Sequence, residues 1–245
     1  MPRSKENPSA QSRLGTCIDR IFYDYPDATV DICFVYGLTG NRDNTCPGGR
    51  LLTYGYDAYV VRKSATSANR LIDYAANLFT DLTNDRVSYN ASSRRFVFVV
   101  YSLGGLVCKE AVLLSRNNPT AHLRGIFDCV VGIAFMGTPY RGSTRFWSMV
   151  REVRESGRPL EVTCFFEELP VPAIGRVVPK ESATLEGYTA VSVHADHRDM
   201  VRFGSADDNG FKRLFAELTR WQELIDPTPS SQQATLQKDD GARTS

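Results

Sequence analysis

Apolar residues along the chain fall into two alternating patterns, short continuous runs and longer stretches with helical spacing. The runs expected to form strands are Val30–Tyr36, Arg50–Tyr56, Arg95–Tyr101, Cys129–Met136, Leu160–Phe166 and Tyr188–Val193. Helical spacing begins at Ser67 and recurs over Leu106–Leu114 and Asn209–Ile225. Strands that alternate with helices predict an α/β domain with a mostly parallel sheet and helices on both faces. Sites in such sheets form at the carboxyl ends of the strands.

Two of the expected helices have a clear apolar face. The helix that opens at Ser67 carries Ala68, Leu71, Ile72, Ala75, Leu78, Phe79 and Leu82 along one side. The helix at Asn209–Ile225 carries Phe211, Leu214, Phe215, Leu218 and Trp221 along one side. We expect both helices to pack on the sheet by these faces.

The chain has 245 residues, a length that suits one α/β domain. Residues 1–13 and 227–245 are polar, and we expect both segments to be disordered around a single domain at 14–226. The N-terminal residues lack the apolar core of a secretory signal, and no apolar stretch approaches the length of a transmembrane helix. The sequence therefore predicts an intracellular protein.

Charge and cysteine content narrow the function further. Lys and Arg total 29 against 28 Asp and Glu, so the formal net charge is +1. This balance provides no long-range field for nucleic acid, and no base-reading motif is visible. The six cysteines show neither a C-x-x-C pair nor metal-ligand spacing with histidine. We expect them to be reduced, with several serving as small core residues.

The strongest local motif is Val99–Gly105, read VVYSLGG. A buried strand leads directly into Ser102, two glycines and a helix, which is the pattern of a nucleophile elbow. The turn would lift the serine hydroxyl above the sheet edge, and the glycines would let helix and strand approach closely. Val100 stands where the G-x-S-x-G pattern has its first glycine. A glycine-rich turn with an incidental serine is the alternative interpretation.

Two backbone N–H groups could stabilise an oxyanion beside Ser102. The N–H of Leu103 follows the serine directly, and the glycine-bearing loop after Val30–Tyr36 offers the N–H of Leu38. Without a nearby catalytic serine, the second segment would be interpreted as an ordinary turn between strand and helix.

A serine nucleophile needs a base and an acid. His194 and His197 follow the last short strand, where a hydrolase places its histidine loop, and the residues alone leave both open. Glu167 and Glu168 end the preceding strand, and side-chain alternation allows only one of them to face the site. We take Glu167 as the acid and keep Glu168 as the alternative.

The chain resembles a known family through five motifs that occur in order. They are Val35–Arg42 (VYGLTGNR), Thr53–Asp57 (TYGYD), Tyr101–Val107 (YSLGGLV), Met136–Ser143 (MGTPYRGS) and Ala195–His197 (ADH). The chain is similar to the lipase-like α/β-hydrolase domain related to serine active site-containing protein and to DUF676 and GPI inositol-deacylase-type hydrolases. It looks particularly like the fungal versions, which often precede NACHT, ankyrin or TPR modules. The likeness spans most of residues 28–222.

The resemblance implies a serine esterase or lipase that uses neither metal nor organic cofactor. It assigns the nucleophile to Ser102, the base to His197 and the acid to Glu167. It also implies a small ester or lipid substrate, and it places some members at mitochondrial or endoplasmic-reticulum membranes. Peripheral membrane contact and a protein partner are both compatible with it, besides a cytoplasmic location.

Three positions and two segments depart from the family pattern. Tyr36, Tyr101 and Tyr140 stand where the family usually has histidine. The helix-bearing stretch usual in the family is missing between Asn44 and Arg50, and the lid-like region between Ser143 and Leu160 is reduced to a single expected helix. Two functions therefore stay open, an active carboxylic-ester hydrolase and an inactive hydrolase-fold module for binding or signalling. A truncated product of low stability is a third interpretation.

Overall fold

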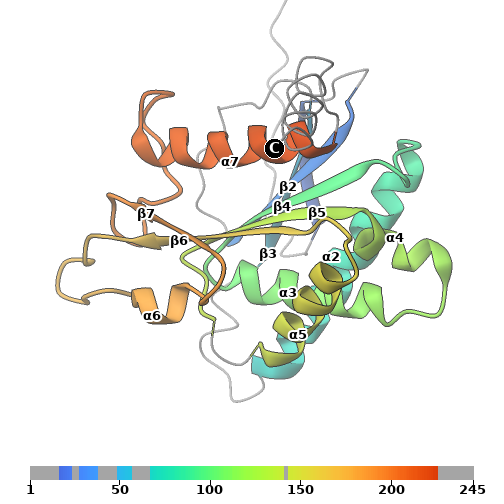
Figure 1. The fold of residues 1–245 in the computed structure, drawn as a ribbon, viewed down its shortest axis with the longest axis horizontal. Coiled ribbons are helices and arrows are strands. Elements are labelled where there is room, and N and C mark those ends of the chain that lie inside the picture. The colour runs from blue at the N-terminus through green and yellow to red at the C-terminus, as the bar shows by residue number, and fades with distance from the viewer. Residues whose placement is uncertain (1–16, 24–27, 38–48, 57–66, 141–142, 226–245) are drawn as a thin grey trace, which may run out of the picture.

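Figure 1 shows the computed structural model, which describes residues 17–23, 28–37, 49–56, 67–140 and 143–225. Its centre is a seven-stranded sheet in the order β1-β3-β2-β4-β5-β6-β7. The strands are β1 (Cys17–Tyr23), β2 (Val30–Gly37), β3 (Gly49–Tyr56), β4 (Arg95–Tyr101), β5 (Val130–Met136), β6 (Glu161–Glu167) and β7 (Thr189–Val193). Six strands are parallel, and β1 pairs antiparallel with β3 at the edge. The six predicted strands are confirmed.

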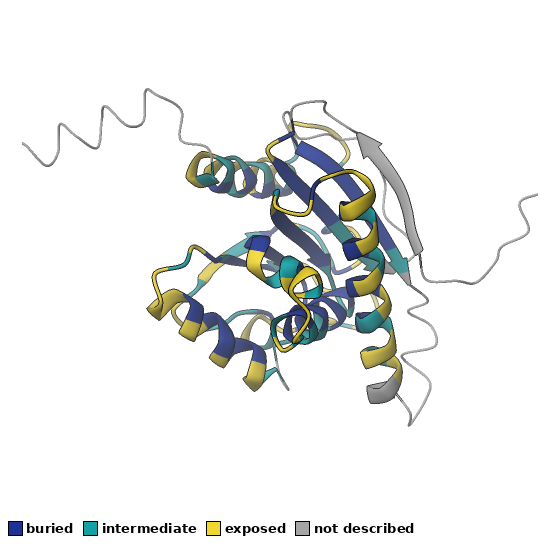
Figure 2. Ribbon diagram, turned by 90° about the vertical axis from the view of Figure 1, so that its right-hand side faces the viewer, coloured by how far each residue is buried: buried dark blue, intermediate teal, exposed yellow. Residues whose placement is uncertain are grey.

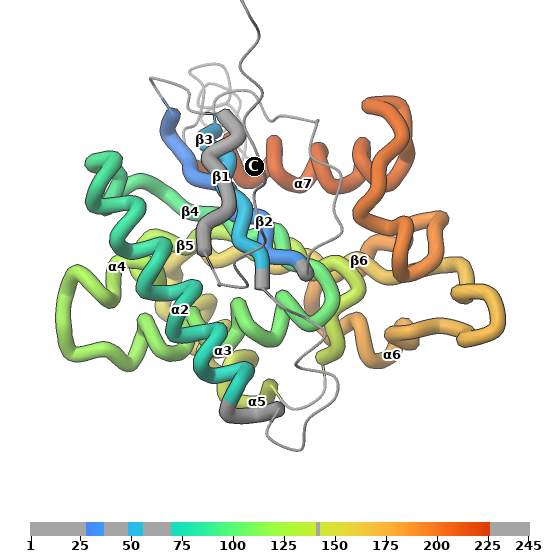
Figure 3. Tube along the Cα trace, turned by 180° about the vertical axis from the view of Figure 1, so that it is seen from behind, coloured from blue at the N-terminus to red at the C-terminus, as the bar shows by residue number. Residues whose placement is uncertain are grey.

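Helices cover both faces of this sheet (Figures 1 and 3). One face carries α2 (Ser67–Ser88), α3 (Gly104–Arg116), α4 (Ala121–Cys129) and α5 (Thr144–Glu155), with the short α6 (Lys180–Ala183) beyond them. The other face carries α7 (Asn209–Ile225), which contacts β5 and β7. Within the described residues, α5 alone occupies the region in which the sequence predicts a shortened lid. The other short segment, after Asn44, lies mostly outside the described residues.

The apolar core forms two layers, which Figure 2 shows as buried strands and helix faces. The larger layer lies between the sheet and α2–α5, and the smaller one lies under α7. In the smaller layer Trp221 packs against β5 at Gly132, where an added Cβ would lie 2.5 Å from the indole ring. Glycine at this position therefore makes room for the helix.

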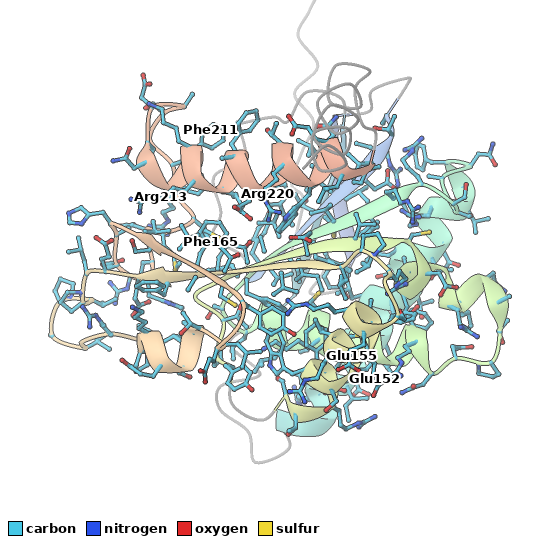
Figure 4. The ribbon with its side chains drawn as sticks, in the orientation of Figure 1. Glu152, Glu155, Phe165, Phe211, Arg213 and Arg220 are labelled. Atoms are coloured by element: carbon cyan, nitrogen blue, oxygen red, sulfur yellow. The ribbon has the colours of Figure 1, made fainter. Side chains whose placement is uncertain are left out.

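Polar contacts as well as apolar packing fix helix α7. Asp208 accepts a hydrogen bond from the Gly210 N–H at 2.7 Å, which caps the first turn. Figure 4 labels Arg213 and Arg220 on this helix, with Phe165 of β6 below it. Arg213 donates to the Ser192 carbonyl of β7, and Arg220 pairs with Glu161 of β6 at 3.0 Å. These contacts hold α7 across the last two strands.

The predicted helix faces are confirmed in most positions. On α2 the residues Ala75, Leu78, Phe79 and Leu82 are buried, whereas Ile72 is 47% exposed and was wrongly predicted as part of the face. On α7 the buried residues are Leu214, Leu218 and Trp221, and Phe211 and Phe215 are only half-buried. Four cysteines are free and buried in the core: Cys33, Cys108, Cys129 and Cys164.

A buried ionic cluster lies at the sheet edge opposite the carboxyl ends of the strands. Asp31 at the start of β2 is fully buried and accepts hydrogen bonds from Arg50 at 3.2 Å, Arg86 at 2.6 Å and Arg94 at 2.9 Å. Arg50 also pairs with Asp85 of α2. One carboxylate therefore links three arginines from β3, α2 and the loop before β4.

The strand order, the antiparallel edge strand and the helices on both faces define an α/β-hydrolase fold, as the sequence predicts. The chain runs outward from β4 through β5 and β6 to β7, so the carboxyl ends of β4, β6 and β7 meet one edge of the sheet. No helix in the described part of the chain is both long and apolar enough to cross a bilayer.

Candidate active site

The turn between β4 and α3 holds Ser102 in a conformation that side chains rarely adopt. Its φ is +52°, in the left-handed region, and its N–H donates to the Met136 carbonyl of β5 at 2.9 Å. The strand, the strained serine and the following helix form the tight turn that the motif VVYSLGG predicts. This turn raises Ser102 above the carboxyl end of the sheet.

Both glycines after Ser102 are required by close packing. A Cβ on Gly104 would lie 2.6 Å from the Val35 carbonyl oxygen of β2, and one on Gly105 would lie 2.2 Å from the Thr138 hydroxyl oxygen. Real Cβ atoms do not approach so closely. Helix α3 can therefore start directly behind the serine only because these two positions lack side chains.

His197 joins Ser102 to Glu167. Its Nε2 lies 3.0 Å from the Ser102 Oγ, and its Nδ1 lies 2.7 Å from the Glu167 Oε2. A carboxylate can only accept, so Nδ1 carries the proton and Nε2 is left to accept the serine O–H. His197 and Glu167 are both buried, which keeps water from competing for the contact between them.

Glu167 is itself fixed by the backbone of the loop after β6. It is buried at the end of the strand, and its Oε1 accepts the N–H groups of Val177 at 2.6 Å and Val178 at 3.2 Å. One carboxylate oxygen is thus held by the main chain and the other is directed to the imidazole. Hydrogen bonds to both oxygens satisfy a charge that burial alone would disfavour.

A second histidine–carboxylate pair lies on the surface close by. His194 Nδ1 is 2.8 Å from Glu168 Oε2, and the two side chains are 72% and 35% exposed. Hydrogen bonds from Ser192 and His194 lower the pKa of Glu168. Successive side chains at the end of β6 point to opposite faces of the sheet, which separates Glu167 from Glu168. The structure therefore brings Ser102, His197 and Glu167 together. It leaves His194 and Glu168 outside this series. His122 is exposed on α4.

Two further residues support His197, and the sequence assigned neither of them this position. The Tyr101 hydroxyl donates to the His197 carbonyl at 2.6 Å, and its ring lies 5.1 Å from the imidazole, centroid to centroid. Gly137 has a φ of +54°, and a Cβ there would lie 3.0 Å from His197 Cε1 and Nδ1 and 2.7 Å from Met200 Sδ. Gly137 belongs to the MGTPYRGS motif, and that motif was the available signal.

Of the two predicted oxyanion donors, Leu103 lies within the described residues. Leu103 stands between Ser102 and α3, and its N–H donates to no acceptor within the described part of the chain. Leu38 lies outside the described residues. The N-terminal end of α3 adds a partial positive charge on the same side as the Leu103 N–H.

Comparison with known proteins yields structural likeness alone. No family model matches the chain, and no curated protein matches it. A type II thioesterase of the yersiniabactin biosynthetic pathway, YbtT, shares 12% identity with a TM-score of 0.48, covering 83% of this chain and 97% of its own. Esterase Est2 of Thermogutta terrifontis shares 12% identity with a TM-score of 0.45, covering 85% and 87%. A putative hydrolase of Agrobacterium vitis S4 shares 8% with a TM-score of 0.42, covering 78% and 87%. Likeness of this degree does not assign an activity or a substrate.

Proposed function

We propose that the protein is a serine hydrolase that cleaves carboxylic esters through an acyl-enzyme. The observation that carries this proposal is the hydrogen-bonded series from Ser102 through His197 to Glu167, with separations of 3.0 Å and 2.7 Å. Three residues from distant parts of the chain have the order and contacts that make a serine hydroxyl nucleophilic. An incidental serine in a glycine-rich turn would not require a buried imidazole and carboxylate beside it.

The proposed reaction has two halves. His197 Nε2 takes the Ser102 proton as Oγ attacks the ester carbonyl, and the Leu103 N–H stabilises the oxyanion with Leu38 as the second donor. The imidazolium then protonates the leaving oxygen of the ester. The C–O bond breaks, the alcohol departs, and Ser102 carries the acyl group. In the second half His197 activates water, which frees the acid. Glu167 stabilises the imidazolium in both halves.

We propose an apolar, lipid-like ester as the substrate. Support comes from the loop after β6, whose Val177 N–H holds Glu167 and whose Leu169, Ile174 and Val177 side chains are exposed. Exposed apolar groups on the loop that holds the acid favour an ester with an apolar chain. This preference agrees with the resemblance of the five motifs to lipase-like, DUF676-type hydrolases. It also agrees with peripheral contact at an organelle membrane, which that resemblance implies.

A fluorophosphonate probe, which phosphonylates activated serines with loss of fluoride, tests the reaction. We expect wild-type protein to be labelled, and Ser102→Ala and His197→Ala to lose labelling. His194→Ala is a matched control, because it removes the neighbouring exposed imidazole and should label like wild type. Thermal melts of each variant verify folding. Folded wild type that resists the probe and hydrolyses no p-nitrophenyl ester from acetate to octanoate would instead support the inactive binding module.

A further inference from the structure

Lys109 is a buried cation close behind the nucleophile. It lies on α3 and is only 2% exposed. Its ammonium donates to the Pro139 carbonyl at 3.2 Å and lies 4.8 Å from the Phe135 ring centroid and 5.1 Å from that of Trp147. A backbone carbonyl and two ring faces are favourable partners for a cation. They bring together α3, β5, α5 and the loop that follows β5.

The ammonium has no carboxylate partner in the described part of the chain. The titratable groups that act on it are two thiols, Cys108 on its own helix and Cys164 on β6. Burial raises the pKa of both thiols, that of Cys164 to about 11, so they are neutral near pH 7. Trp147 faces Lys109 from α5, and Tyr140 of the loop packs on that indole. Burial lowers the pKa of Lys109 to about 8.

The loop held by Lys109 also lies against His197 and against the start of α3, the helix behind Ser102. Gly137 lies against the His197 imidazole, and Thr138 lies against Gly105 at the start of α3. Pro139 follows directly and accepts the Lys109 hydrogen bond. A shift of this carbonyl would therefore move the backbone on which the imidazole rests, relative to the helix that begins behind Ser102.

We propose that Lys109 is a positioning residue, whose ammonium fixes the 137–139 loop and through it the alignment of His197 with Ser102. This inference rests on the proposed function. A neutral amine can still donate to Pro139, but it loses the charge-assisted strength of that bond and its attraction to the two rings. Alignment should therefore weaken when Lys109 loses its proton.

Stability responds to the same proton in the opposite direction. The pKa of Lys109 lies below the ordinary lysine value of 10.5, so between about pH 8 and 10.5 the unfolded chain binds more protons than the folded chain. The Lys109 contribution to stability thus increases with pH over this window. If kcat falls with increasing pH while the Lys109 contribution to Tm rises, the loss of activity comes from lost alignment and not from unfolding.

The experiment compares wild type with Lys109→Met and Lys109→Arg in steady-state ester hydrolysis and thermal melts from pH 6.5 to 9.5. Lys212→Met serves as control, because Lys212 is an exposed partner of Asp207. We expect Lys109→Met to keep the wild-type Tm at pH 7, because an apolar chain replaces a buried charge that lacks a counterion. Its kcat should fall by about tenfold with little change in KM.

The pH profile provides the second readout. Wild-type kcat should decline above about pH 8, whereas the Lys109→Met profile should lack this limb and Lys109→Arg, which stays charged, should restore activity at pH 9. A Lys109→Met variant with the same kcat as wild type would overturn the positioning role. So would a Lys109→Met variant in which kcat and Tm both fall at pH 7. An inactive, folded wild type would overturn the proposed function itself.

Discussion

Replacing Glu167 by glutamine changes one oxygen to an amide nitrogen in the most constrained part of the site. Oε1 of Glu167 accepts two backbone N–H groups, and Oε2 faces His197 Nδ1. A glutamine amide has one acceptor and one donor end. If its NH2 faced the N–H groups of Val177 and Val178, hydrogen-bond donors would face donors. The carbonyl end must therefore take the Oε1 position, and the NH2 must face the imidazole.

This orientation imposes the wrong tautomer on His197. Nδ1 then has to accept a hydrogen bond, so the proton moves to Nε2, which can no longer accept the Ser102 O–H. The variant also loses the negative charge that stabilises the imidazolium. Together these losses should lower kcat by about 10³- to 10⁴-fold, equivalent to roughly 4 to 5.5 kcal/mol in activation free energy.

Glu168→Gln provides a matched control for this measurement. It makes the same chemical change one residue along the chain, in the exposed pair with His194. Initial rates with a p-nitrophenyl ester, together with the rate of fluorophosphonate labelling, should drop in Glu167→Gln and stay within about twofold of wild type in Glu168→Gln. Equal losses in both variants, or a Glu167→Gln enzyme with more than about a tenth of wild-type kcat, would refute the tautomer reasoning.

Three further variants test the surroundings of the site and the core. Tyr101→Phe removes the hydroxyl that holds the His197 carbonyl and keeps the ring, so kcat should fall by about threefold to tenfold, consistent with a lost hydrogen bond of roughly 1 kcal/mol; an unchanged kcat would deny it a positioning role. Gly137→Ala forces a Cβ against the imidazole at positive φ, and we expect labelling to slow by about tenfold or more; labelling at the wild-type rate would contradict the packing. Asp31→Asn leaves the buried guanidinium of Arg86 without its anion and takes one of the two anions from Arg50. Urea denaturation should therefore show a loss of about 3 to 5 kcal/mol in unfolding free energy, against almost none for the exposed Asp207→Asn.

The central strands and the last helix were predictable because a local pattern determines them. β4 and α7 begin and end where the sequence analysis placed them, since a continuous apolar run and a strong helical period each leave one interpretation. Strand β1 was missed. It carries Asp19 and Arg20 among its apolar residues, and its strand structure depends on antiparallel pairing with β3.

The site was predictable where it depends on chain order and alternation, and unpredictable where it depends on long-range contact. The order of serine, acid and histidine follows the strand order, and alternation along β6 separates Glu167 from Glu168. The contact between Tyr101 and His197 joins residues 96 positions apart, so no local pattern could reveal it. In the sequence Lys109 likewise looks like an ordinary helical residue, because β5 and α5, which enclose it, follow later in the chain.

The nucleophile and its base come from strands formed at different times during synthesis. Ser102 lies 95 residues before His197, and β7, which leads to that histidine, pairs with β6 alone among the described strands. A ribosome therefore exposes the serine well before the His197 imidazole can reach it. Incomplete nascent chains should be chemically inert, and reactivity would first emerge once the last strand joins the sheet, so covalent capture could time the final step of folding.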